Sequence, residues 1–439
     1  MPKVPTSWST RLRAPLQRVS WGLGDQAVSS LTNFFVGMVV ARSLGATEFG
    51  VFSLAWVTYG VALNVSRGLA TDPLVVRFSG VDDGSWRAAV SRSAGTASVV
   101  GLATGVCCVL VGLVLGGQLA AAFIALGIVL PGLLLQDSWR YAFFAHGQGG
   151  RAFANDMVWA VALVPALLLA DRHPSVVSFL LAWGLAGGVA AVFGSLQTRI
   201  LPSMRAIRAW LAAQRDLGPR FLIENVSLSG TNQLWLYGLG AISGLAAVGA
   251  VRGAQLLLGP FLALLMGLSL VGVPEAARVL RRSPGRLPMF CFLFGGVQLA
   301  AALVWGLAIL FLLPDAGGRL VLGSVWVPAL ALIVPATVST MSAGFTTGAA
   351  AGLRALGAAR RSLRAQLLVS VVTVIGGLVG AVLAGALGSY WGVALANVFR
   401  IAVWWWQLRA AMRERTAADA PGELSAVGAR AGRVEESSA

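Results

Sequence analysis

Three arginines lie inside long apolar segments, where a charged side chain is costly and marks a functional site. Arg252 lies eight residues into the segment 245–273, and Arg400 lies about twelve residues into the last such segment. Arg67 lies near the end of an earlier one, where its side chain can also reach the membrane surface. A guanidinium group keeps its charge and binds phosphate through two parallel hydrogen bonds. The three arginines are therefore candidates for binding an anionic substrate, and a structural ion pair is the alternative for Arg252 and Arg400.

Asp25 and Glu224 are acidic residues in the first turns of two other apolar segments, near 20–41 and 220–241. A carboxylate at this depth can bind a coupling cation, pair with an arginine, or lie among the lipid head groups. Both residues are candidates for ion coupling, and the other two roles stay open.

An internal repeat relates these two segments. An offset of 199 residues pairs Asp25 with Glu224, Ser30 with Ser229, Thr32 with Thr231, and Asn33 with Asn232. At about 100° per residue, the polar side chains fall in one sector of each helix. A polar stripe is costly against lipid, so each stripe should face the other half of the protein or a watery cavity. We expect the stripes as a whole to line such a cavity, with hydrogen bonding between helices as the alternative for any single Ser, Thr or Asn.

Residue types that carry enzymatic or metal chemistry are sparse. The three cysteines, Cys107, Cys108 and Cys291, lie in apolar segments and are expected to pack as small side chains. His146 and His173 lie in different loops, and no Walker A, HExxH or nucleophile-elbow pattern occurs. We therefore expect no catalytic residue, no metal site and no cofactor, and the chain is not expected to be an enzyme.

The elements that must position these residues are transmembrane helices. The chain is 57% hydrophobic and 11% charged, with a mean hydropathy of +0.78, whereas soluble domains carry about 25% charged residues. Its apolar runs are long enough to cross about 30 Å of hydrocarbon and do not alternate as barrel strands do. The sequence predicts an all-α polytopic membrane protein with about twelve spans, near 20–41, 47–70, 92–116, 118–138, 152–170, 175–196, 220–241, 245–273, 287–312, 326–352, 364–386 and 388–408.

The net charge of +16 follows the predicted topology. Of the 33 lysines and arginines, 27 fall in the two termini and in the connections predicted to lie on the same side of the membrane as the termini. Only Arg42, Arg172 and Arg319 fall in the connections on the opposite side of the membrane. The positive-inside rule then makes both termini cytoplasmic. The charge sets orientation in a membrane, so no nucleic-acid partner is expected.

An even number of spans divides the chain into two parallel six-helix halves. The basic segment 197–219 is amphipathic, and we expect it to lie on the membrane surface as a helix that joins the halves. The predicted organisation is a basic cytoplasmic N-terminus at 1–19, a first half at 20–196, this linker at 197–219, a second half at 220–408 and a disordered cytoplasmic tail at 409–439.

The opening stretch Trp21–Ala55 resembles the first two helices of bacterial polysaccharide flippases of the Wzx type, in the MATE-like MOP exporter superfamily. The similarity is carried by Asp25-Gln26, Thr32-Asn33, Ala41-Arg42, Leu44-Gly45 and Glu48-Phe49-Gly50. A second, weaker similarity is Arg140–Trp159, which looks like the segment after the fourth helix of that family.

The resemblance implies a transporter of the bacterial cytoplasmic membrane that moves a glycan linked to a lipid pyrophosphate by alternating access. The pyrophosphate would be held by Arg252 and Arg400, with Arg67 as a further contact. The polar stripes would contact the sugar hydroxyls, through Thr32, Asn33, Thr231 and Asn232. Membrane lipids would surround the carrier chain, and a polysaccharide polymerase or glycosyltransferases would be partners. Two other hypotheses stay open: a MATE-like cation-coupled drug antiporter, which needs central carboxylates, and a non-transporting scaffold of a glycan-assembly complex.

Overall fold

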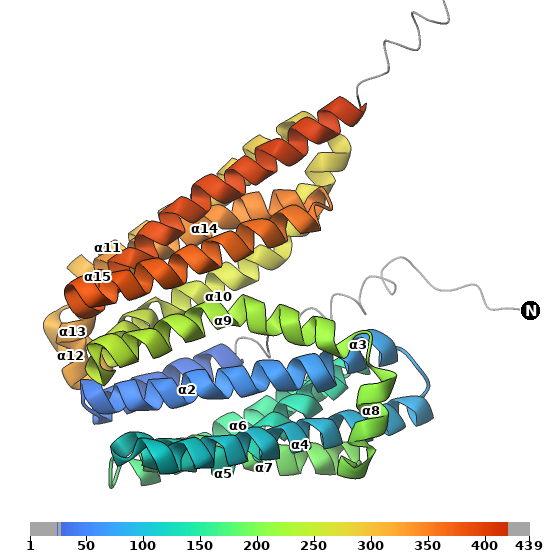
Figure 1. Cartoon of the computed structure of the whole chain (residues 1–439), viewed down its shortest axis with the longest axis vertical. Coiled ribbons are helices and arrows are strands. Elements are labelled where there is room, and N and C mark those ends of the chain that lie inside the picture. Colours follow the sequence, from blue (N-terminus) through green and yellow to red (C-terminus); the bar gives the residue numbers. More distant parts are fainter. Residues whose placement is uncertain (1–23, 25–27, 420–439) are drawn as a thin grey trace, which may run out of the picture.

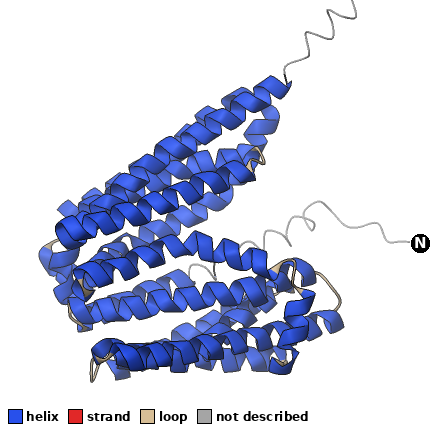
Figure 2. Ribbon diagram, viewed as in Figure 1, coloured by secondary structure: helices blue, strands red, loops and turns tan. Residues whose placement is uncertain are grey.

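The chain folds into long helices in a computed structural model that describes residue 24 and residues 28–419 (Figure 2). No strand occurs among these residues. The elements are a helix at 28–43, α2 (Ala46–Ser66), the π-helix η1 (Arg67–Thr71), α3 (Asp72–Phe78), α4 (Asp83–Leu115), α5 (Gly117–Ala145), α6 (Gly149–Ala170), α7 (Val176–Thr198), η2 (Met204–Ala206), α8 (Ile207–Ala213), α9 (Gly218–Ser243), α10 (Leu245–Arg282), η3 (Pro284–Arg286), α11 (Leu287–Phe311), α12 (Asp315–Leu322), η4 (Gly323–Val325), α13 (Trp326–Leu330), α14 (Ile333–Ala355) and α15 (Ala359–Asp419).

The predicted all-helical membrane fold is confirmed. Within the described part of the chain, eight helices are long and apolar enough to cross a membrane, or nine if the pair Asp315–Leu330 and Ile333–Ala355, bent by 90°, forms one span. The 26-residue helix α9 is not among them, because its polar residues lower its hydropathy. The helix α15 contains a break at Ala384 and Gly385, where the backbone leaves the helical region. The count of twelve spans stays a prediction.

Glycines allow neighbouring helices to touch backbone to backbone. A Cβ on Gly105 of α4 would lie 2.5 Å from the carbonyl oxygen of Gly127 on α5. The break in α15 turns the helix back on itself, and a Cβ on Gly392 would lie 1.9 Å from the carbonyl oxygen of Gly376. Lipid supplies no hydrophobic force between helices, so this close packing of small residues is what holds such pairs together.

The helices form two groups that diverge from each other (Figure 1). The first group contains α2 and α4–α7, the second contains α10, α11, α14 and α15, and α9 lies between them. The connections that carry arginines lie at the end of the molecule that holds α3 and α8 (Figure 1). We call this end the basic end. The end that holds α12 and α13 is called the opposite end. The groups meet at the opposite end, where a Cβ on Gly50 of α2 would lie 1.8 Å from the Leu245 carbonyl oxygen of α10.

The second span changes its helical geometry where Pro73 enters it. A proline has no N–H, so the carbonyl four residues earlier, that of Leu69, loses its usual helical donor. The indole N–H of Trp210 on α8 donates to this carbonyl over 3.0 Å. The hydroxyl of Ser93 on α4 donates to the neighbouring carbonyl of Ala70 over 2.9 Å. Side chains from two other elements thus satisfy the backbone around the break.

The linker is therefore more than a surface helix. Its regular part, α8, has seven residues rather than the longer helix that the amphipathic pattern indicates. Trp210 is 2% exposed, and its ring stacks on Phe78 of α3 with centroids 5.9 Å apart. Arg77 on α3 binds both carboxylate oxygens of Asp216, at 2.6 and 2.7 Å. These contacts fix the linker to the basic end of the first group.

Candidate functional site

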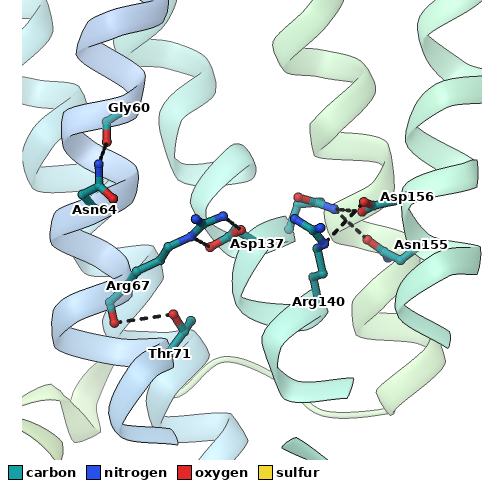
Figure 3. Close-up of polar contacts among 9 residues, drawn as sticks. Gly60, Asn64, Arg67, Thr71, Asp137, Arg140, Asn155 and Asp156 are labelled. Carbon is teal, nitrogen blue, oxygen red and sulfur yellow. Dashed lines mark hydrogen bonds and ion pairs between the residues drawn. The ribbon is translucent and has the colours of Figure 1, made fainter. Parts of the chain in front are cut away.

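Arg67 forms a two-pronged ion pair with Asp137 of α5 (Figure 3). Its Nε donates to one carboxylate oxygen over 3.0 Å and its Nη2 to the other over 2.7 Å. The Asp137 side chain is 5% exposed and that of Arg67 is 26% exposed. The guanidinium carbon also lies 5.1 Å from the centre of the Tyr141 ring, close enough for a cation–π attraction.

The π-helix η1 places this arginine. Arg67 is its first residue, and the N–H of Asp72 reaches back five residues to the Arg67 carbonyl. Such wide turns are rare and recur at functional sites. Gly68 follows directly, and a Cβ there would lie 2.6 Å from the Leu222 backbone of α9. The wide turn and the glycine together let α9 approach the backbone beside the ion pair.

A second charged group lies beside the first and joins α5 to α6. Arg140 lies 3.4 Å from Asp156, and Gln136 donates to the other oxygen of that carboxylate over 2.8 Å. Gln136 also donates to Asn155 over 3.1 Å, and Asn155 donates to the Ala190 carbonyl of α7 over 2.8 Å. Figure 3 shows the two ion pairs side by side between the helices. Because buried charges are costly unless paired, the first group holds its two arginines neutralised.

Polar contacts also join α2 and α3 to α9. Asn64 donates to the Ser229 hydroxyl over 2.8 Å, and Asn225 donates to the Asp72 carboxylate over 2.7 Å. Nearer the opposite end, the hydroxyls of Thr58 and Tyr237 are 2.7 Å apart. Two members of the predicted polar stripe of the seventh span, Asn225 and Ser229, thus face the first group of helices. For these two residues, the structure therefore shows hydrogen bonding between helices, the alternative role given above for single polar residues of the stripe.

The two arginines of the second group have a different environment. Arg252 on α10 donates to the side-chain oxygen of Gln255 over 2.9 Å, and Gln255 is hydrogen-bonded to Tyr390 of α15. The Nε of Arg400 is buried without an acceptor. Within the described residues, neither guanidinium has an ion pair with a carboxylate. The alternative of a structural ion pair is therefore not found within that part of the chain, where no carboxylate compensates the positive charge of either residue.

Arg67 and Arg252 do not meet. Both α2 and α10 begin at the opposite end, where Gly50 and Gly249 lie close together. Arg67 comes seventeen residues after Gly50 and Arg252 three residues after Gly249, a difference in depth of about 20 Å at about 1.5 Å per residue. A single pyrophosphate therefore cannot touch both in this conformation. Their roles in binding stay predictions.

The remaining predicted residues are dispersed. Asn33, Asn232 and Glu224 are exposed, whereas Thr32 and Thr231 are partly buried. Asp25 lies outside the described residues, as do the predicted N-terminal segment 1–19 and the end of the tail. No group of three His, Cys, Asp or Glu side chains in the described part of the chain could hold a metal ion.

Comparison with solved structures shows which proteins share this fold. No family model matches the sequence, and no curated protein is similar to it in sequence. A structure described as a lipid II flippase MurJ in an inward closed conformation superposes with a TM-score of 0.69 at 8% identity, over 89% of this chain and 87% of the other. An inward-facing multidrug resistance MATE transporter of the MOP superfamily has a TM-score of 0.66 at 15% identity, over 92% and 96%. The chain has the fold of MOP-superfamily transporters.

An outward-facing structure of a MATE family transporter also has this fold, and it superposes with a TM-score of 0.50 at 14% identity, over 94% of this chain and 99% of the other. Within this chain, the helix groups meet at the opposite end and diverge toward the basic end (Figure 1).

Asp137 and Asp156 are the residues that sequence reasoning missed. Asp137 is next to the end of the span predicted at 118–138. The helix continues to Ala145, so Asp137 lies well inside it and is 3% exposed, and Asp156 is 5% exposed. The sequence does contain a signal for this site. Gln136, Asp137 and Arg140 lie within four residues of one another, and such a cluster of charged and amide side chains indicates a polar site inside a helix.

Proposed function

We propose that this protein is a membrane transporter that moves an anionic, lipid-pyrophosphate-linked glycan precursor across the bacterial cytoplasmic membrane by alternating access. One observation carries the proposal: Arg252 and Arg400, two guanidinium groups of the second helix group, have no carboxylate partner among the described residues. A charge in such a place is costly, and an anionic substrate would neutralise it. The similarity to a fold shared with a lipid II flippase supports the same reading.

In this proposal the basic end and both termini face the cytoplasm, and the described conformation is open to that side. The pyrophosphate meets the arginines one after another, because Arg67 and Arg252 lie at different depths. The sugars contact the exposed amides of Asn33 and Asn232, with Thr32 and Thr231 beside them. Asp25 and Glu224 remain the proposed ion-coupling residues, and a polysaccharide polymerase or glycosyltransferases remain the proposed partners.

The drug antiporter is less well supported by the arrangement of charges. Exchange of an organic cation for a proton or sodium ion needs a carboxylate that can release its partner. Asp137 is held in two hydrogen bonds by Arg67, and Asp156 is held by Gln136 and Arg140. Both buried carboxylates of the first group are thus already neutralised, whereas the unpaired charges of the described residues in the second group are positive.

Transport in proteoliposomes tests the proposal. Each variant is reconstituted with an undecaprenyl-pyrophosphate-linked oligosaccharide, and the fraction that crosses is measured with a glycosidase that cannot enter the vesicles. We expect Arg252→Ala and Arg400→Ala to slow translocation about tenfold or more, the effect of losing a hydrogen bond to a charged group. Arg252→Lys should keep part of the rate.

Arg281→Ala is the matched control, because Arg281 lies on the same helix as Arg252 and is exposed at the basic end. Its rate should equal that of the unmodified protein. Equal rates for Arg252→Ala, Arg400→Ala and the unmodified protein would reject binding of the anion by these residues. Absence of translocation by the unmodified protein would favour the scaffold hypothesis.

A further inference from the structure

A groove of about 730 Å³ lies on the second helix group, between α11, α14 and α15. Pro288, the second residue of α11, places the groove at the basic end. Its lining is apolar and aromatic apart from two arginines; the residues are Pro288, Phe292, Phe345, Ile401, Ala402, Trp405, Trp406, Leu408, Arg409, Met412 and Arg413. The lining includes none of Arg67, Arg252 and Arg400 and no residue of the charged network of α2, α5 and α6.

The floor of the groove is a set of packed aromatic rings. The rings of Phe345 and Trp405 stack with their centres 5.1 Å apart, and Phe292 meets Phe345 edge-on at 5.4 Å and Trp405 at 6.1 Å. These rings come from α11, α14 and α15, so their positions are fixed by three helices. Such a floor presents a smooth apolar surface to a hydrocarbon chain.

Hydrogen-bond donors of α15 lie next to these rings. Trp405, Arg409 and Arg413 are spaced by four residues and therefore share one face of α15. Both arginines are exposed, and within the described residues neither has a carboxylate partner. The indole N–H of Trp405 is buried with no acceptor. Three donors without a compensating acceptor beside an apolar floor fit a ligand that is anionic at one end and apolar at the other.

We infer that this groove binds an anionic phospholipid of the surrounding leaflet, with the phosphate at Arg409 and Arg413 and an acyl chain along Phe292 and Phe345. Clusters of arginine at the membrane surface attract anionic lipid head groups, and tryptophan anchors at the same depth. The apolar floor distinguishes a lipid from a soluble phosphate, which would have no use for it. The inference does not depend on what the protein transports.

The experiment measures lipid retained by the purified full-length protein. The protein is exchanged into detergent with phosphatidylglycerol or phosphatidylcholine, and bound lipid is counted by native mass spectrometry. We expect phosphatidylglycerol to be retained and phosphatidylcholine to be lost. Arg409→Gln combined with Arg413→Gln should weaken phosphatidylglycerol binding about tenfold or more, since each arginine adds to the attraction. Trp405→Phe keeps an aromatic ring but removes the N–H donor, so a smaller loss is expected.

Arg360→Gln combined with Arg364→Gln is the matched control. These residues lie at the start of the same helix, are also four residues apart and are exposed, yet they do not line the groove. Retention should be unchanged in this control. The inference would be overturned if both double variants lost phosphatidylglycerol equally, or if the unmodified protein retained the two lipids equally. A bound mass that corresponds to a polyprenyl-pyrophosphate glycan would overturn it as well.

Discussion

The ion pair of Arg67 and Asp137 shows how a single residue depends on a partner seventy positions away in the sequence. Both side chains lie inside helices of a membrane protein, and two hydrogen bonds join them. Neither charge is stable there alone, because the cost of desolvation is offset only while the pair is intact. The pair therefore holds α2 and α5 in one relative position.

Removing one partner should be more harmful than removing both. Asp137→Asn leaves the Arg67 charge without its counter-ion, and we expect a loss of about 3 kcal/mol in the free energy of unfolding. Arg67→Gln combined with Asp137→Asn should recover a large part of that loss. Unfolding in detergent, followed by circular dichroism against denaturant, measures both. A double variant that is less stable than the single one would contradict this account.

Sequence reasoning could find Arg67 but not its partner. The charge of Arg67 stands out in an apolar segment, whereas Asp137 lay beside the predicted end of a span at 118–138. The prediction limited each span to about 30 Å of hydrocarbon, but α5 continues to Ala145. The direction in which each side chain points also depends on how the helices are rotated against one another. Local periodicity carries no information on that rotation.

At the scale of the elements, the break in the second span depends on hydrogen bonds from other helices to its backbone. Pro73 removes a backbone donor, and α8 supplies a replacement through Trp210. A seven-residue helix is too short to be stable alone, so α8 in turn depends on its contacts with α3 and α4. The amphipathic pattern of the linker predicted a helix but could not predict this contact, since its acceptor is a backbone carbonyl on another element.

Trp210→Phe tests the support of this break. The change keeps an aromatic ring against Phe78 but leaves the Leu69 carbonyl without its donor, and a buried unsatisfied group costs about 1–3 kcal/mol. We expect a lower melting temperature in detergent. Trp406→Phe is the control, because Trp406 is 64% exposed. The melting temperature of this variant should equal that of the unmodified protein. Equal melting temperatures for the two variants would mean that Trp210 acts through its ring alone.

At the scale of the whole molecule, the two helix groups are joined where α2 and α10 cross. A Cβ on Gly50 would lie 1.8 Å from the Leu245 carbonyl oxygen, and one on Gly249 would lie 2.0 Å from the Ala46 carbonyl oxygen. The 199-residue offset of the internal repeat also pairs Gly50 with Gly249. Their meeting in space could not be foreseen from it, because a repeat gives similarity and not contact.

Gly50→Ala should push the two helix groups apart at the opposite end. The new Cβ must move by about 1.6 Å to reach the ordinary contact distance of 3.4 Å. Spin labels at the exposed residues Val114 and Leu320, in a variant without the three native cysteines, should report a longer distance. Gly45→Ala is the control, since a Cβ there meets nothing within 4 Å. An unchanged distance in Gly50→Ala would show that the crossing adapts locally.

The position of this crossing has a mechanical consequence. From Gly249 to Arg282, α10 extends about 50 Å at about 1.5 Å per residue, so nearly the whole helix lies on one side of the contact with α2. If the contact acts as a fulcrum, a rotation of about 10° displaces the far end by about 9 Å along this lever arm. The residues at the fulcrum itself barely move. Large motion at the basic end is therefore compatible with two glycines that tolerate no added side chain.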